Sequence, residues 1–287
     1  MESNNSRLMA VDGETGEVFD GAKIYTKEQL EANKRHKEIQ EKAEQYRADK
    51  PENQFVWNLF SGYKNLSDLK PQTAIRLTYL ATYLEYDSDF LKNNGDLITR
   101  EKMQSLMCLK KSTYINFLRE VTEHNYLIKE KKRYRINKED FNKGKLEPSK
   151  DLSENRAMRI YINAIRKLYL TIPQSKHVYL GYVFQLIPYV NREYNIVCHN
   201  PLETNRDNID PITVGQFCEL IGYDRTHAAR LINVYRDIVF EWQGKKHDLI
   251  RIIKPANNAQ SFICVNPLIL FAGNDYHRNE IFEKYFM

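Results

Sequence analysis

The strongest constraint on the fold of this chain is a pattern that occurs twice, 114 positions apart. Residues 97–121 read LITREKMQSLMCLKKSTYINFLREV, and residues 211–235 read PITVGQFCELIGYDRTHAARLINVY. The apolar positions keep the same phase in both segments without a gap, so that Met103 aligns with Phe217 although few identities survive. We interpret the pair as an internal duplication, and two independent instances of one common geometry are the alternative.

Each copy predicts two short helices joined by a tight turn. Thr99 and Thr213 stand just before the first helix, where a threonine hydroxyl caps free backbone N–H groups. The turn follows at Cys108 or at Gly222, and a glycine there tolerates the left-handed conformation in which many helices end. The two copies therefore share their caps as well as their apolar pattern.

The second helix of each copy, which we expect to begin near Ser112 or Asp224, has two contrasting faces. Apolar residues at helical spacing predict a buried stripe, made by Ile115, Leu118 and Val121 in one copy and by Ala229, Ile232 and Tyr235 in the other. The opposite face carries groups that hydrogen-bond to phosphates and base edges: Lys110, Lys111, Ser112, Thr113, Asn116 and Arg119, then Arg225, Thr226, His227, Arg230 and Asn233. This is the layout of a helix-turn-helix whose second helix enters the major groove of DNA.

A basic hairpin is predicted after each second helix. Alternating polarity surrounds a basic tip in residues 125–137 and again in residues 239–253. The candidate DNA-binding residues of these tips are Lys131, Lys132, Arg133, Lys245, Lys246 and His247, with Gly244 in the second turn. A basic hairpin beside a helix-turn-helix is a wing, which lies along the phosphate backbone or reaches into the minor groove. The sequence therefore predicts two winged helices in tandem.

The expected fold class is mostly α with small β-hairpin wings, an α+β chain of tandem winged helix-turn-helix modules. Residues 1–20 favour a flexible arm or a short hairpin, and residues 26–50 favour a solvated helix with pairs such as Glu31–Arg35. The predicted domains are an N-terminal arm and charged helix (1–71), a first module (72–145), a linker (146–155), a second module (156–273) and an amphipathic tail (274–287).

Composition limits the class of protein further. The 287 residues suffice for about two domains, 42% of them are hydrophobic, and the net charge of +5 suits a nucleic-acid partner without requiring one. The four cysteines, Cys108, Cys198, Cys218 and Cys264, are too scattered for a disulfide framework or a zinc module, which favours a reducing cytoplasm. No signal peptide is recognisable and no apolar run reaches the ~18 residues of a membrane helix, so no membrane partner is expected.

Three segments of the chain carry a family resemblance. They are VDGETGEVFDG (11–21), ITVGQFCELIGYDRTHAARLINVYRDI (212–238) and FICVNPLILFAGND (262–275). They resemble the RepL-type replication initiators of plasmids from Firmicutes, and related phage replication and regulatory proteins. The resemblance implies a winged-helix fold, binding to a replication origin and recruitment of host machinery without chemistry of its own. The chain departs from that family in its greater length, its added N-terminal module and the insertion at 194–210.

Motifs of catalysis are absent from the sequence. It contains no GxxxxGK[ST], GxSxG or HExxH segment and no HxH pair for the metal of a nicking enzyme, and Cys198-His199 is its only adjacent pair of soft metal ligands. We therefore expect no enzyme, no cofactor and no bound metal. The predicted function is sequence-specific binding of double-stranded DNA, by a plasmid or phage replication initiator that recognises origin repeats.

Three alternatives stay open at this point. A phage or plasmid transcriptional regulator needs the same DNA contacts as an initiator. An adaptor would instead use its winged helices to bind host replication or transcription proteins. A nicking replicase would use one of the 19 tyrosines as its nucleophile. Pairing of two copies into a homodimer is equally open.

Overall fold

The computed structural model describes residues 10–11, 18–19, 26–35, 37–38, 54–60, 65–131, 133–144, 146, 156–254, 261–273 and 286. The chain divides into an N-terminal unit, residues 1–49, and a compact unit, residues 50–287. Among the described residues, no helix is long and apolar enough to cross a membrane.

The N-terminal unit contains a small hairpin and a helix. Strands β1 (Ala10–Val11) and β2 (Val18–Phe19) pair antiparallel, so the four described residues of this segment agree with the hairpin alternative. Residues 27–35 and 37–38 are helical, and their described side chains are exposed. The predicted pair forms, with the Arg35 guanidinium 3.8 Å from the Glu31 carboxylate. The rest of the predicted helix, residues 39–50, lies outside the described residues.

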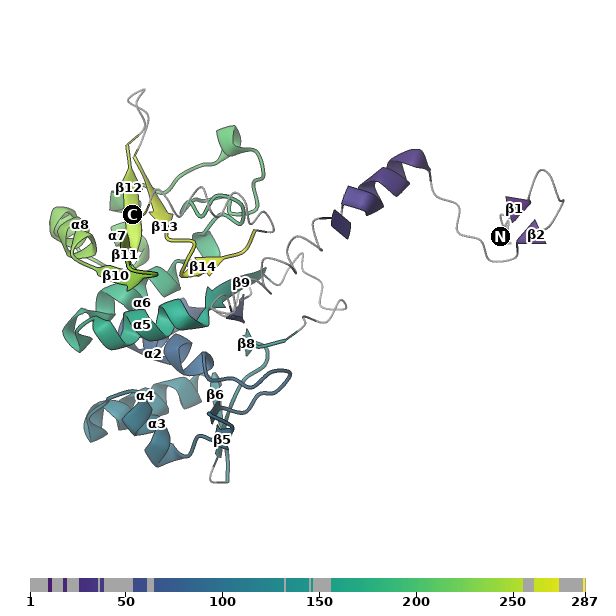
Figure 1. Ribbon diagram of the computed structural model, residues 1–287. Coiled ribbons are helices and arrows are strands. Elements are labelled where there is room, and N and C mark those ends of the chain that lie inside the picture. Colours follow the sequence, from purple (N-terminus) through teal and green to yellow (C-terminus); the bar gives the residue numbers. More distant parts are fainter. Residues whose placement is uncertain are drawn as a thin grey trace, which may run out of the picture. The chain divides into compact units, whose positions relative to one another are not determined.

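The larger elements of the compact unit run in two successive series (Figure 1). The N-terminal half contains β3 (Phe55–Phe60), α2 (Pro71–Ala81), α3 (Arg100–Leu106), α4 (Lys111–Glu123), β6 (Leu127–Glu130), β7 (Arg133–Ile136) and β8 (Phe141–Asn142). The C-terminal half contains β9 (Arg156–Tyr161), α5 (Ile162–Thr171), α6 (His177–Gln185), α7 (Val214–Leu220), α8 (Ala228–Arg236), β10 (Val239–Trp242), β11 (Lys245–Asp248), β12 (Ile250–Ile253), β13 (Phe262–Val265) and β14 (Leu270–Phe271).

Shorter elements complete the two halves. They are the hairpin β4 (Lys92–Asn93) and β5 (Asp96–Leu97), and the 3-10 turns η2 (Leu66–Asp68), η3 (Gln174–Lys176), η4 (Ile187–Tyr189), η5 (Arg206–Asn208) and η6 (Arg225–His227). Of the predicted tail, Phe286 alone is described. Its ring is buried against Ile196, Cys198 and Cys264, and its carbonyl accepts a hydrogen bond from the Asp248 N–H at 3.1 Å.

One antiparallel sheet of four strands joins the two halves, in the order β14–β9–β3–β8. Within each half the first strand pairs with the last, and the two first strands pair with each other from Phe55↔Tyr161 to Phe60↔Arg156. The fold is therefore mixed α+β with small antiparallel hairpins, as expected, and it also contains this four-stranded sheet, which the sequence did not predict. Residues 55–60, which the sequence assigned to the N-terminal arm, form a central strand because their partners lie far along the chain.

The larger of two hydrophobic clusters among the described residues runs from Val56 to Ala272 and includes residues of both halves. Helix α2 lies at its centre, packed against α5 and α6, and its Ala74, Ile75 and Leu77 are fully buried. Gly181 of α6 allows this close packing, since a Cβ atom at that position would lie 1.8 Å from the carbonyl oxygen of Pro71. The two halves are thus parts of one folded body.

Polar and aromatic contacts also cross between the halves. The Arg166 guanidinium lies 3.8 Å from the centre of the Tyr83 ring and donates to the Thr82 carbonyl at 2.8 Å. The Tyr79 and Tyr169 rings stack with centroids 3.9 Å apart. These contacts fix α5 against the C-terminal end of α2.

Buried histidines predict how the stability of the fold depends on pH. His177 is 0% exposed; its Nε2 lies 3.1 Å from the carbonyl oxygens of Tyr169 and Ile172, and its Nδ1 is buried without a hydrogen-bond partner. Burial lowers the pKa of His177, and burial followed by the nearby Lys245 lowers the pKa of His247. Both rings therefore take up protons at a lower pH in the folded chain than in the unfolded chain, where histidine has a pKa of about 6.5.

Because the unfolded chain binds more protons in that range, the free energy of unfolding should fall as the pH drops below about 6.5. The expected loss is at most about 1.4 kcal/mol per pH unit for each histidine, until its lowered folded pKa is reached. Denaturant titrations of the wild type and of His177→Gln between pH 7.5 and 5 measure it. We expect a shallower pH dependence in the variant, and identical curves would contradict the role of His177.

Candidate nucleic-acid interface

The first two-helix unit consists of α3 and α4. The Thr99 hydroxyl caps α3 by accepting a hydrogen bond from the Lys102 N–H at 3.3 Å. The chain then turns at Cys108, whose φ of 53° is left-handed. Beneath the turn, Met103 and Phe117 are buried in the core. The cap and the turn lie where the sequence placed them.

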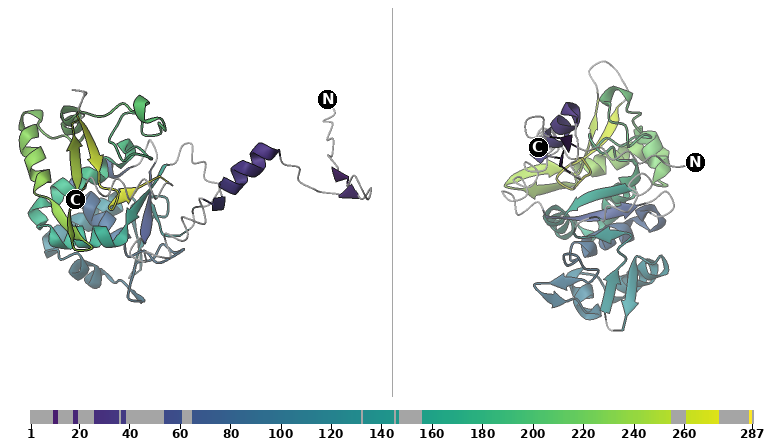
Figure 2. Two further views of the ribbon diagram at one scale, coloured as in Figure 1. Left: turned by 45° about the horizontal axis from the view of Figure 1, so that its top comes forward. Right: turned by 90° about the vertical axis from the view of Figure 1, so that its right-hand side faces the viewer.

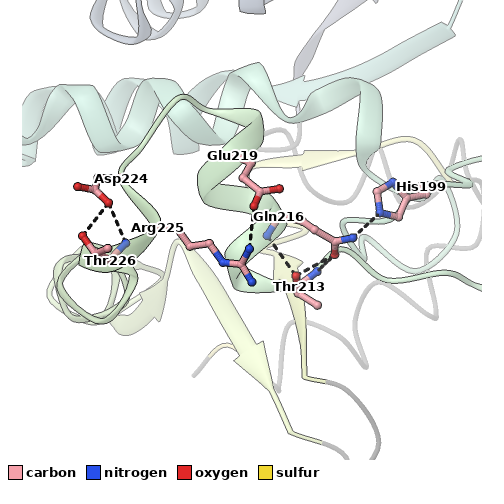
Figure 3. A network of polar contacts seen from close by, with 7 residues as sticks. All are labelled: His199, Thr213, Gln216, Glu219, Asp224, Arg225 and Thr226. Carbon is pink, nitrogen blue, oxygen red and sulfur yellow. Dashed lines mark hydrogen bonds and ion pairs between the residues drawn. The ribbon is translucent and has the colours of Figure 1, made fainter.

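The second two-helix unit consists of α7, the 3-10 turn η6 and α8 (Figure 3). The Thr213 hydroxyl accepts from the Gln216 N–H at 3.1 Å, while the Gln216 side chain accepts from the Thr213 N–H at 2.8 Å, which closes a capping box. The turn has Gly222 at φ 65°. The Asp224 carboxylate then accepts from the Thr226 N–H at 2.8 Å and so starts the second helix.

The first helix and the turn of the two units correspond position by position, whereas the second helix starts as an α-helix at Lys111 in one unit and as the 3-10 turn η6 at Arg225 in the other. Helices α3 and α7 begin and end 114 positions apart, and so do the left-handed residues Cys108 and Gly222. After the turn, the Leu109 N–H donates to the Gln104 carbonyl at 3.4 Å, and at the equivalent place the Tyr223 N–H donates to the Cys218 carbonyl at 2.8 Å. The correspondence therefore includes caps, turn and hydrogen bonds in addition to the apolar pattern. Helices α2, α5 and α6 lie between the two units (Figures 1 and 2).

The buried face of each second helix differs in phase from the expected stripe. Leu118, Val121 and Tyr235 are buried as expected, but Ile115 is 43% exposed, Ala229 is exposed and Ile232 is half-buried. The positions that fill the core are instead Tyr114, Phe117, Leu118 and Val121 in α4, and Leu231 and Tyr235 in α8 with Ala228 and Val234 packed against it. The sequence of α4 allows two overlapping apolar stripes, one that contains Ile115 and one that contains Tyr114 and Phe117. The second stripe, which has the larger aromatic side chains, is the one buried in the core.

The outer face of each unit presents most of the predicted site residues to solvent. In the first unit the exposed residues are Lys110, Lys111, Ser112, Asn116 and Arg119, with Thr113 half-buried. In the second unit they are Arg225, Thr226, His227, Arg230 and Asn233. Each outer face therefore gathers the predicted hydrogen-bonding groups on one surface.

The two outer faces differ in how their charges are paired. In the second unit Arg225 forms an ion pair with Glu219 at 3.0 Å, and the Thr226 hydroxyl donates to the Asp224 carboxylate at 2.7 Å (Figure 3). The hydrogen bonds from Thr226 lower the pKa of Asp224, which therefore stays ionised beside His227. At the positions equivalent to Asp224 and Glu219 the first unit has Lys110 and Ser105. The first outer face is thus the more cationic of the two.

Side chains of the core and of the other half hold the turn of the first unit. The Tyr79 hydroxyl donates to the Leu106 carbonyl at 3.2 Å, and from the C-terminal half the Tyr169 hydroxyl donates to the Met107 carbonyl at 3.0 Å. Gln174 likewise donates to the Cys108 carbonyl at 2.6 Å. Burial raises the pKa of Tyr169 to about 12, so its hydroxyl keeps the proton that it donates. No local pattern predicts the contacts of Tyr169 and Gln174, because they join residues more than 60 positions apart.

In each half, one hairpin on the C-terminal side of the second helix forms a β-bridge to a residue that precedes the two-helix unit. Arg135 of β7 bridges to Phe90, and the Ile136 N–H donates to the Asp89 carbonyl at 2.9 Å. In the C-terminal half Cys264 of β13 bridges to Ile196 in the same way, with the Val265 N–H donating to the Asn195 carbonyl at 3.0 Å. The counterpart of hairpin β6–β7 is therefore β12–β13.

The second predicted hairpin forms around Gly244, but it is not the hairpin that pairs in the same way as β6–β7. The basic turn at Gly244 belongs to hairpin β10–β11, which has no counterpart in the described part of the N-terminal half and contacts α5. Lys245 and Lys246 are exposed there, but His247 is 4% exposed and packs on Phe240, so its ring is not available to a ligand. In β6–β7, Lys131 and Arg133 are exposed, and Lys132 lies outside the described residues.

Within the described part of the chain, no group of three or more His, Cys, Asp or Glu residues is placed to hold a metal ion. Cys198 and Cys264 are buried, and burial raises the pKa of both thiols. Comparison of the chain with protein-family models, with curated proteins and with solved structures gave no match.

Proposed function

We propose that the chain carries two tandem winged helix-turn-helix modules and binds specific sequences of double-stranded DNA. The observation that supports this most is the repetition of one geometry: two units with equivalent caps and turns each expose a polar, cationic second helix beside a hairpin paired in the same way. Helices α4 and α8 would enter the major groove, where Asn and Arg side chains recognise purine edges. Asn116, Arg119, Arg230 and Asn233 are the residues that would do so.

For the biological role, we propose a plasmid or phage replication initiator that acts in the bacterial cytoplasm and binds repeats at an origin. The resemblance of the second two-helix unit and the closing segment to RepL-type initiators supports this role. A plasmid whose only origin contains the bound sequence should then replicate when this chain is supplied and fail without it. Unchanged replication together with altered transcription from an adjacent promoter would identify a transcriptional regulator instead.

Selection of bound sequences from a random duplex library tests the DNA-binding proposal directly. We expect one enriched site, and an affinity that falls linearly on a log–log scale as salt is raised, because bound lysines and arginines release counterions from the phosphates. An adaptor for host proteins would show neither enrichment nor salt-sensitive binding. Cleavage of supercoiled DNA that depends on a divalent metal would instead favour a nicking replicase.

The first wing should contribute mainly to the salt dependence. Replacing Lys131 and Arg133 by alanine should weaken binding to every duplex and reduce the salt slope by roughly 0.9 for each phosphate that these side chains neutralise. Both side chains are exposed on β6–β7. The matched control removes two charges at Lys245 and Lys246 of the extra hairpin, where we expect an unchanged slope. If the salt slope falls equally in both variants, β10–β11 contacts the duplex as well. If it falls in neither variant, the first wing does not contact the phosphates.

A further inference from the structure

One apolar side chain interrupts the polar outer face of each second helix at the same place. Ile115 of α4 is 43% exposed, and Ala229 of α8, which lies 114 positions later, is also exposed. Isoleucine on a solvated helix face adds little to folding, since its side chain stays in water and loses rotamer freedom in the helix. Ile115 therefore points to a role outside the core, and Ala229 occupies the equivalent position on α8.

The neighbours of these two residues show what kind of surface they belong to. In the first unit Ser112, Ile115, Asn116 and Arg119 follow at spacings that place them on one face of a helix. The same spacing in the second unit gives Thr226, Ala229, Arg230 and Asn233. Each stripe thus consists of a hydroxyl, one apolar group, and an Asn and an Arg in opposite orders.

Such a stripe fits the floor of a major groove better than it fits an apolar protein surface. Hydroxyl, amide and guanidinium groups match phosphates and purine edges, and the 5-methyl group of thymine is the only apolar group that the bases present in that groove. The Asn116 side-chain oxygen already accepts a hydrogen bond from Arg119 at 3.3 Å, but a protein partner that covered Ile115 with apolar atoms would leave the Ser112 hydroxyl and the Asn116 amide N–H groups unpaired, which is unfavourable.

We propose that Ile115 and Ala229 are specificity-determining residues, each in contact with a thymine methyl group in its own half-site. This inference rests on the proposed DNA binding and adds the base that each module requires. The isoleucine side chain is longer than that of alanine, so we expect the affinity for the first half-site to depend more strongly on the thymine methyl group. Burying one methyl group corresponds to about a fourfold change in affinity.

Duplexes that carry deoxyuridine in place of each thymine of the selected site, one at a time, provide the test, because uracil lacks only the methyl group. With the full-length chain we expect one position per half-site at which uracil weakens binding, by about fourfold in the first half-site and by less in the second. Ile115→Ser should bind thymine and uracil equally at the first position and keep the preference at the second. Ala229→Ser should do the reverse, which gives a second test should one variant fold poorly.

The outcomes separate this inference from the function on which it rests. If no sequence is enriched, the proposed DNA binding fails and the methyl contacts fail with it. If a site is enriched but uracil is tolerated at every position, the DNA binding stands and the methyl contacts are wrong. A preference for thymine that survives in Ile115→Ser and Ala229→Ser would likewise overturn the assignment.

Discussion

Replacing Gly181 by alanine should lower the free energy of unfolding of the compact unit by about 3 kcal/mol, the upper end of the range for overpacked cores. The new Cβ atom would lie 1.8 Å from the carbonyl oxygen of Pro71 and 2.2 Å from its carbonyl carbon. Both are backbone atoms, and the proline ring fixes φ at that residue, so no side-chain rotation relieves the clash. Helices α2 and α6 must move apart, which loosens the packing around fully buried residues such as Leu180.

Gly222→Ala is the matched control, because it adds the same methyl group where space is free. Gly222 has a φ of 65°, and a Cβ atom there would meet no atom within 4 Å. The cost is therefore the backbone strain of a left-handed alanine, about 1 kcal/mol. Denaturant titrations of the three proteins compare the two effects. Equal losses in both variants would contradict the close approach of α6 to α2.

The same titrations test whether the halves unfold together. Strands β3 and β9 pair over six residues and one core includes both halves, so a single cooperative transition is expected for the compact unit. The Gly181→Ala variant should shift that whole transition. Two transitions, of which only one moves, would show that the halves are independent domains after all.

Local signals predicted the two-helix units well. A threonine before a helix, an amide three residues later and a glycine after the helix act through hydrogen bonds within a few residues, so they are visible in the sequence. Thr213 with Gln216 forms its capping box, and Gly222 takes the left-handed conformation. Cys108 shows the limit of such signals. It adopts a φ of 53° without being glycine, and only its alignment with Gly222 indicated the turn.

The phase of the second helices could not be predicted reliably from the sequence. In α4 the apolar residues Tyr114, Ile115, Phe117 and Leu118 support two overlapping stripes, because each has neighbours three or four positions away. The choice depends on what packs against the helix. Tyr114 is buried and its hydroxyl donates to the Arg100 carbonyl at 2.7 Å, whereas Ile115 is left in solvent.

Long-range pairing explains the remaining errors. The turn Gln243-Gly244 is a strong local hairpin signal, and a hairpin does form there. Which hairpin becomes the counterpart of β6–β7 depends instead on the bridge from Ile196 to Cys264, which joins residues far apart in the sequence. The central sheet was missed for the same reason, since β3 pairs with β9 about a hundred residues later and each strand alone is only a short apolar run.

Replacing Arg230 by alanine should reduce the affinity for the selected site by about 1–3 kcal/mol and flatten the preference among sequences, if its guanidinium forms a bidentate contact with a guanine. Arg230 is exposed on the outer face of α8 and has no ion-pair partner among the described residues. Arg225 is less suited to this role, because Glu219 already pairs with it at 3.0 Å and a base edge would have to compete with that carboxylate.

Arg236→Ala is the control for Arg230→Ala, since it removes the same charge from the same helix. The two positions are six residues apart, which at about 100° per residue turns the side chain by roughly 240°, away from the Arg230 stripe. Arg236 donates to the Asn233 side chain at 3.2 Å near the end of α8. We expect this variant to bind all duplexes slightly more weakly, with any change in base preference confined to the position that Asn233 contacts, because Arg236 hydrogen-bonds to Asn233. Binding of both variants to the selected site and to single-base variants of it distinguishes a base contact from a phosphate contact. An equal loss of affinity for all sequences in Arg230→Ala would show that Arg230 contacts a phosphate. Base recognition would then depend on Asn233 and the first module.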